Sequence, residues 1–131
     1  MSGSLDTNIV LRLMRHDIPE QTRQAAELLD SVDEPFEVAD IVFVEVAHVL
    51  ERYYGVSRPT IQTLLLEFAR LDSVNCNASL LKQALPTYVN HPALSFEDCC
   101  LAAYAEIQKA LPLYTFDRKL ARQVNGVQYV C

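Results

Sequence analysis

The sequence has little of the features that mark several specialised protein classes. It contains only three glycines and six prolines in 131 residues, and half of its residues are hydrophobic, a composition that argues against disorder. No apolar run approaches the roughly 18 residues that a membrane-spanning helix needs. The first residues lack the basic and apolar regions of a signal peptide, so we expect a cytoplasmic protein without a membrane segment.

The cysteines also lack the spacing of a familiar site. No two of them form a C-x-x-C pair, and Cys99 and Cys100 are adjacent, which suits neither a disulfide nor a zinc site. We therefore interpret Cys76, Cys99, Cys100 and Cys131 as reduced, small hydrophobic residues. A Gly-rich phosphate loop and a G-x-S-x-G motif are both absent from the sequence.

The net charge of −6 argues against non-specific adhesion to nucleic acid. It does not exclude an enzyme of nucleic acids, because clustered active-site carboxylates add negative charge that a bound metal ion offsets. Basic residues gather in two places, Arg12 with Arg15, and Arg118 with Lys119 and Arg122. Either group could be a solvated helix face, and the sequence leaves that alternative open.

The length fits a single domain over residues 1–131. Short apolar runs alternate with longer helical periods, which predicts an α/β fold with a parallel sheet covered by helices. Strands are expected near Leu5 and over residues 36–39, 71–76, 113–115 and 127–130; helices are expected through residues 9–13, 19–33, 40–54, 57–70, 78–85 and 95–109 and around Leu120.

Several residues predict where these helices begin and end. Asp40, Ser57 and Ser95 are expected to cap the helices that follow them. Gly55 suits a helix C-terminus, and Pro86 is expected to end or kink its helix. The first turns of the helix after Asp40 are apolar almost all round and should be buried.

Four acidic residues stand beside apolar residues: Asp6, Glu45, Asp98 and Asp117. A carboxylate that leaves water costs several kcal/mol unless it is paired or bound to metal. Asp6 and Asp117 each follow a predicted strand, and ligands of parallel sheets bind outside the carboxyl ends of the strands. These four residues are therefore candidates for one divalent-metal site.

Each of the four also has a structural explanation. Asp6 and Asp117 could be helix N-caps, and Ser95 with Asp98 resembles a capping box. Glu45 could form a buried pair with His48, three residues further along the same helix, although a metal ligand is the better interpretation.

Taken together, the four carboxylates are oxygen ligands without a matching His/Cys set, which favours Mg²⁺ or Mn²⁺ over zinc. Four such groups within a few ångströms would repel one another until a cation compensates them. A site of this kind suits phosphodiester hydrolysis, in which one metal ion activates water and a second, ~4 Å away, stabilises the leaving oxygen. Thr7, Asn8 and Thr115 could orient the ligands and waters.

The sequence resembles the PIN-domain ribonucleases and, within them, the VapC-type toxins of bacterial type II toxin–antitoxin systems. The resemblance covers nearly the whole chain. It rests on four segments, Leu5-Asp6-Thr7-Asn8-Ile9-Val10-Leu11-Arg12, Glu45 in its apolar helix, Leu94-Ser95-Phe96-Glu97-Asp98, and Thr115-Phe116-Asp117-Arg118. The sequence departs from the family in its first strand, which lacks the usual apolar run, and in Glu97, where the family more often has a small or neutral residue.

The resemblance implies a three-layer α/β/α fold with a central parallel sheet and metal-dependent endonucleolytic cleavage of RNA. By motif, Asp6, Glu45, Asp98 and Asp117 would be the catalytic, metal-binding acids, and Thr115 a supporting residue. It also implies a homodimer and a cognate antitoxin that inserts a segment beside the active site. The helices at about 19–33 and 57–70, each with an apolar stripe, are our candidates for the antitoxin groove.

The sequence thus predicts a Mg²⁺- or Mn²⁺-dependent endoribonuclease, the toxin of a toxin–antitoxin pair. The main alternative is a catalytically silent PIN-fold protein that acts through a protein partner, which the presence of all four acids disfavours. A haloacid-dehalogenase-like phosphatase would need an Asp-x-Asp motif, and position 8 is Asn.

Overall fold

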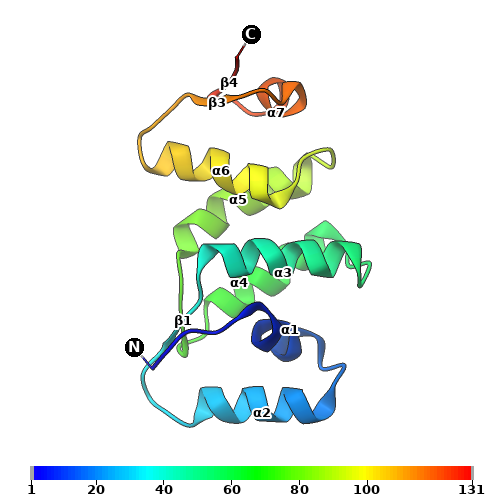
Figure 1. The fold of residues 1–131 in the computed structure, drawn as a ribbon, viewed down its shortest axis with the longest axis vertical. Coiled ribbons are helices and arrows are strands. Elements are labelled where there is room, and N and C mark those ends of the chain that lie inside the picture. The colour runs from blue at the N-terminus through cyan, green and yellow to red at the C-terminus, as the bar shows by residue number, and fades with distance from the viewer. Residues whose placement is uncertain (1, 131) are drawn as a thin grey trace. The chain divides into compact units, whose positions relative to one another are not determined.

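The computed structural model describes residues 2–130. The chain divides into two compact units, Met1–Asn77 and Ala78–Cys131, and each is described by itself (Figure 1). Among the described residues, no helix has both the length and the apolar character needed to cross a membrane. The prediction of one domain over residues 1–131 stays a prediction.

The first unit contains four helices and a short parallel pair of strands. Its elements are α1 (Thr7–Arg15), α2 (Pro19–Asp30), β1 (Phe36–Glu37), α3 (Asp40–Arg52), α4 (Arg58–Ala69) and β2 (Val74–Asn75). β1 runs parallel to β2, with Phe36 opposite Val74. The strand predicted to end near Leu5 is reduced to one parallel bridge between Ser4 and Glu37, because Gly and Ser are poor strand formers.

The core of the first unit lies around α3, which packs against both α1 and α4. Phe43, Val46, Ala47 and Leu50 form the buried stripe of α3, at i, i+3, i+4 and i+7 spacing. The Phe43 ring meets the edge of Phe68 from α4 at a centroid distance of 6.3 Å. The expectation that the first turns of α3 are buried all round is wrong, since Ile41 is 74% exposed.

The helix ends of the first unit follow the sequence with one exception. The Ser57 hydroxyl caps α4 by accepting a hydrogen bond from the backbone N–H of Thr60. Gly55 adopts φ +65°, the left-handed conformation expected after a helix C-terminus. Asp40, however, is the first residue of α3 and does not cap it; Ala39 occupies the N-cap position without a side-chain hydrogen bond. The Asp40 carboxylate therefore lies in the first turn of α3, where a negative charge interacts favourably with the helix dipole.

The second unit contains α5 (Ala78–Asn90), α6 (Phe96–Ile107), β3 (Leu113–Thr115), α7 (Arg118–Gln123) and β4 (Val127–Tyr129). α5 packs against α6, where the rings of Tyr88 and Phe96 lie 5.1 Å apart. β3 and β4 run parallel, with Thr115 opposite Tyr129. Pro86 does not end its helix, because α5 continues to Asn90 and buries Tyr88 beyond the proline.

The parallel strands and the alternation of helices with strands confirm the predicted α/β class. Cys99 and Cys100 are buried in α6. Burial, with Asp40 and Glu37 nearby, raises the pKa of the Cys76 thiol, as fits an unreactive hydrophobic side chain. Cys131, given the same interpretation, lies outside the described residues.

Candidate active site

Two of the four predicted acids cap helices. Oδ1 of Asp6 accepts a 3.0 Å hydrogen bond from the backbone N–H of Ile9 at the start of α1. Oδ1 of Asp117 accepts hydrogen bonds from the backbone N–H groups of Lys119 (2.9 Å) and Leu120 (3.2 Å) at the start of α7. In both residues the structural explanation is confirmed. Within the described residues the second carboxylate oxygen, Oδ2, makes no hydrogen bond in either, so capping leaves it available to a cation.

Glu45 is not the buried group that its apolar neighbours suggested. It lies on the exposed side of α3, opposite the buried stripe. His48 is exposed as well, and its ring contacts Tyr53 at 6.4 Å, so the alternative of a buried Glu45–His48 pair is wrong. Among residues 2–130, no side chain pairs with the Glu45 carboxylate. The position of Glu45 on the helix exposes its carboxylate to solvent, and water rather than a partner side chain solvates the charge.

Asp98 forms only half of the predicted capping box. Its backbone N–H donates a 3.1 Å hydrogen bond to the Ser95 hydroxyl, which caps α6. The half-buried Asp98 carboxylate accepts no return bond from the start of the helix in the part of the chain that the structure describes. One turn further, Ala102 is buried and Leu101 is 48% exposed, so this face of α6 is only partly inward.

The four acids are divided equally between the two units. Asp6 and Glu45 belong to the first unit, and Asp98 and Asp117 belong to the second. Taken by itself, neither unit gathers three or more His, Cys, Asp or Glu side chains into a potential metal site within residues 2–130. Each unit by itself therefore holds two of the four candidate carboxylates. Their free oxygens fit a hard cation such as Mg²⁺, which oxygen donors prefer.

Of the three predicted supporting residues, Thr115 has a defined contact. Its hydroxyl accepts a 2.9 Å hydrogen bond from the backbone N–H of Asp117. Asn8 is exposed beside Asp6 in the first turn of α1, and Thr7 is the first residue of that helix. The hydroxyl of Thr115 thus fixes the backbone of an acidic candidate, whereas Thr7 and Asn8 contribute proximity alone.

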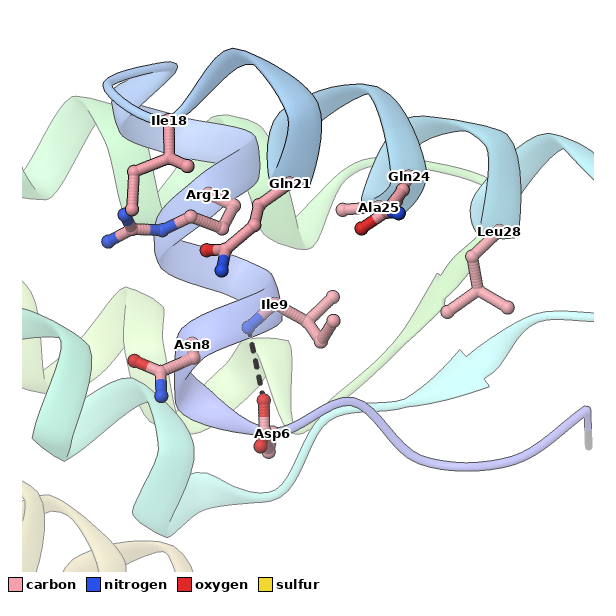
Figure 2. Close-up of a pocket in the computed structure, with 9 residues that line it drawn as sticks. All are labelled: Asp6, Asn8, Ile9, Arg12, Ile18, Gln21, Gln24, Ala25 and Leu28. Atoms are coloured by element: carbon pink, nitrogen blue, oxygen red, sulfur yellow. Dashed lines mark hydrogen bonds between the residues drawn. The ribbon is translucent and has the colours of Figure 1, made fainter.

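A groove of about 520 Å³ runs between α1 and α2, with Asp6 at one end (Figure 2). Its lining combines apolar and polar side chains from both helices. They are Asp6, Asn8, Ile9, Arg12, Ile18, Gln21, Gln24, Ala25 and Leu28. Of the apolar stripe predicted for residues 19–33, Ala25 is buried and Leu28 is partly open to this groove, while Val32 lies beyond the end of α2 and is exposed.

The first basic group of the sequence has an internal role. Arg12 is buried, with an ion pair of 3.0 Å to Asp17 and a hydrogen bond of 3.2 Å to the Tyr54 hydroxyl. The Arg15 guanidinium lies 4.7 Å above the Tyr54 ring. Tyr54 also donates a 2.8 Å hydrogen bond to Asp17, which holds the pKa of that carboxyl below its ordinary value. The alternative of a solvated face is therefore wrong for Arg12.

The second basic group borders an open cavity of about 590 Å³ between α7 and β4. The cavity is lined by Arg118, Ala121, Arg122, Val127, Gln128 and Tyr129. The Arg118 guanidinium lies over the Tyr129 ring, 4.6 Å from its centroid. Tyr129 was not among the residues predicted from the sequence to take part in a site. The alternation of β4, which places Val127 and Tyr129 on the same face, was the available signal.

Comparison with protein-family models gives a match to the PIN domain over residues 4–125. The chain belongs to the PIN-domain family. The match runs through both units and includes all four acidic candidates, and it supports the α/β PIN fold that the resemblance implied. The comparison with curated proteins gave no match.

PIN domains are generally nucleases, hydrolases that act on nucleic acids and typically use divalent metal ions. This PIN domain offers carboxylate oxygens that suit such ions. Asp6 and Asp117 retain one oxygen each beyond their caps, and Glu45 and Asp98 retain their whole carboxylates within the described chain.

Proposed function

We propose that this PIN domain is a Mg²⁺- or Mn²⁺-dependent endoribonuclease in which Asp6, Glu45, Asp98 and Asp117 hold the metal. The supporting observation is that none of the four carboxylates is fully engaged by partners among residues 2–130. Two other acidic residues of this chain are engaged instead: Asp17 and Glu51 each form an ion pair with an arginine. A metal bound there would activate a water molecule and stabilise the leaving oxygen of the phosphodiester.

The chain's own residues would prepare this chemistry. The caps fix the carboxylates of Asp6 and Asp117 at the ends of α1 and α7, so that one oxygen of each is oriented before metal binds. Thr115 holds the backbone of Asp117. Such pre-orientation lowers the cost of assembling a charged site.

The motifs Leu5-Asp6-Thr7-Asn8 and Thr115-Phe116-Asp117-Arg118 support a narrower role, the toxin of a toxin–antitoxin pair. The α1–α2 groove suits the antitoxin segment, because it begins at Asp6 and has apolar walls at Ile18 and Leu28 (Figure 2). The other predicted helix, α4, is unsuitable because Ile61, Leu65 and Phe68 of its apolar stripe are buried in the core of the first unit. A homodimer remains part of the proposal.

The test is cleavage of total cellular RNA by purified protein freed of any antitoxin, in Mg²⁺ or Mn²⁺ and in EDTA. Asp98→Asn is the decisive variant, because the cap of α6 uses the Asp98 backbone and not its carboxylate. Glu97→Gln is its matched control, with the same charge change at the neighbouring, exposed position of the same helix turn.

We expect metal-dependent cleavage by the wild type and Glu97→Gln, and none by Asp98→Asn. Wild-type cleavage that survives in Asp98→Asn would contradict the site. Intact RNA under every metal condition, together with capture of a protein partner, would favour the catalytically silent binding protein.

A further inference from the structure

The cavity between α7 and β4 lies in a basic segment of an acidic protein, and two arginines of that segment, Arg118 and Arg122, line it. Residues 108–131 contain four of the 11 basic residues and only one of the 17 acidic residues, and that acid is Asp117. Such local reversal of charge in a chain of net charge −6 marks a surface that can attract an anion.

The arginines of this cavity have free donors. Arg12, Arg23 and Arg58 each form ion pairs with Asp or Glu side chains. Within the described chain, Arg118 and Arg122 form no ion pair. The only polar contact of their guanidinium groups there is a long hydrogen bond of 3.4 Å from Nε of Arg122 to the Arg118 carbonyl.

The aromatic ring of Tyr129 holds one of these guanidinium groups in place. Arg118 lies 4.6 Å from the ring centroid, so the ring attracts the cation while its N–H edges remain open. An arginine held in this way loses less side-chain freedom when it binds a planar or tetrahedral anion. The cavity therefore combines a pre-oriented guanidinium with a second one four residues along α7.

We propose that this cavity binds the phosphodiester backbone of the single-stranded RNA substrate next to the cleavage site. Two free arginines match backbone phosphates, and Arg118 adjoins Asp117, so a strand bound at the acid would continue over α7. The inference rests on the proposed endoribonuclease function for the identity of its ligand. Contacts of this kind read no base, so the cavity would serve affinity and not sequence choice.

Binding of a short, mixed-sequence, fluorescein-labelled single-stranded RNA in EDTA tests this proposal without cleavage. Anisotropy over a range of salt concentrations compares the wild type with an Arg118→Gln/Arg122→Gln double variant. The control, Arg23→Gln/Arg70→Gln, removes the same charge from α2 and the end of α4. Circular dichroism checks that each variant is folded.

We expect the Arg118→Gln/Arg122→Gln variant to bind RNA about tenfold more weakly, with a salt dependence reduced by about 0.7 for each lost phosphate contact. The control should stay within about twofold of the wild type. Tyr129→Leu should weaken binding and Tyr129→Phe should not, because only the first removes the ring under Arg118.

The outcomes separate this inference from the proposed function. If the wild type cleaves RNA but the Arg118→Gln/Arg122→Gln variant binds RNA with the same affinity and salt dependence as the wild type, only the proposed role of the cavity is refuted. If RNA binding depends on the two arginines but no metal ion supports cleavage, the proposed role of the cavity is supported and the proposed nuclease function is contradicted. If the Arg118→Gln/Arg122→Gln variant loses binding to poly-glutamate but binds RNA like the wild type, the cavity is an acidic-peptide site instead. Absence of all RNA binding in EDTA would refute the proposal for the cavity, whereas the nuclease is judged by cleavage in Mg²⁺ or Mn²⁺.

Discussion

The hydroxyl of Thr115 accepts a 2.9 Å hydrogen bond from the backbone N–H of Asp117. Two residues after the last position of β3, the Asp117 carboxylate in turn caps α7 through Lys119 and Leu120. The end of a strand, an acidic side chain and the start of a helix are therefore connected by three hydrogen bonds. A short connection of this kind fixes the direction of the free Asp117 oxygen.

Thr115→Val should remove this restraint while keeping the shape of the side chain. We expect a loss of about 1 kcal/mol in the free energy of unfolding, because one hydrogen bond is lost. Cleavage should fall by about 10- to 100-fold, the usual range for residues that orient a metal ligand. Urea unfolding and cleavage rates measure the two effects, and Thr115→Ser should restore both. Equal cleavage by the Val and Ser variants would show that the hydroxyl has no positioning role.

Asp117→Asn and Asp117→Ala should separate capping from catalysis. Asn is as good an N-cap as Asp, so the Asn variant should keep nearly wild-type stability, whereas Ala should lose about 1 kcal/mol. Both should lose metal-dependent cleavage, because neither has a carboxylate for the ion. Thermal unfolding and an RNA cleavage assay provide the comparison. An Asn variant that cleaves like the wild type would leave Asp117 as a cap only.

Glu45→Gln should abolish cleavage without a measurable effect on stability. Glu45 is exposed and unpaired within the described residues, so the free energy of unfolding should change by less than about 0.5 kcal/mol. Glu67→Gln, at an exposed position of α4, is the control for loss of one surface carboxylate. If both variants retain activity, Glu45 is not a metal ligand.

The local structure was largely predictable because its signals are short-range. Ser57 and Ser95 cap their helices through bonds that span three residues, and Gly55 takes a conformation that glycine adopts at little cost. Pro86 was harder. Its missing N–H disfavours a helix interior, yet the burial of Leu85 and Tyr88 on either side of it outweighs that cost.

The sequence predicted which residues are candidates for the site, but not how buried they are or what they contact. Apolar neighbours suggested burial for Glu45, whereas the 3.6-residue period places it opposite Phe43 and Ala47. The internal role of Arg12 depends on its hydrogen bond to Tyr54, 42 residues away, and no sequence pattern predicts such a contact. Capping and metal binding both favour Asp at the same positions, so the sequence alone could not separate them.

The Asp17–Tyr54 contact should give acid-dependent stability. The hydrogen bond from Tyr54, with help from Arg12 and Arg15, lowers the pKa of Asp17 below 3.8 in the folded protein. Its stabilisation is then fully present above pH 3.8 and is lost as the pH falls through the lower, folded-state pKa. The stability gap between the wild type and Tyr54→Phe should therefore narrow in acid. Urea unfolding across this range tests it, with Tyr53→Phe as control; a constant gap would contradict the linkage.

Metal binding should stabilise the folded chain if the four carboxylates form one site. An ion that binds only the native state adds about 2.7 kcal/mol at a concentration 100 times its Kd, enough to raise the Tm by several degrees. Mn²⁺ titration by thermal unfolding should show this shift in the wild type and Glu97→Gln.

The shift should be much smaller in Asp98→Asn, which removes a ligand from the second unit, and in Asp6→Asn, which removes one from the first while keeping the cap of α1. A shift that needs both Asp6 and Asp98 would support a centre that contains both carboxylates. A wild-type Tm independent of Mn²⁺, or a shift that survives both substitutions, would contradict the four-carboxylate centre.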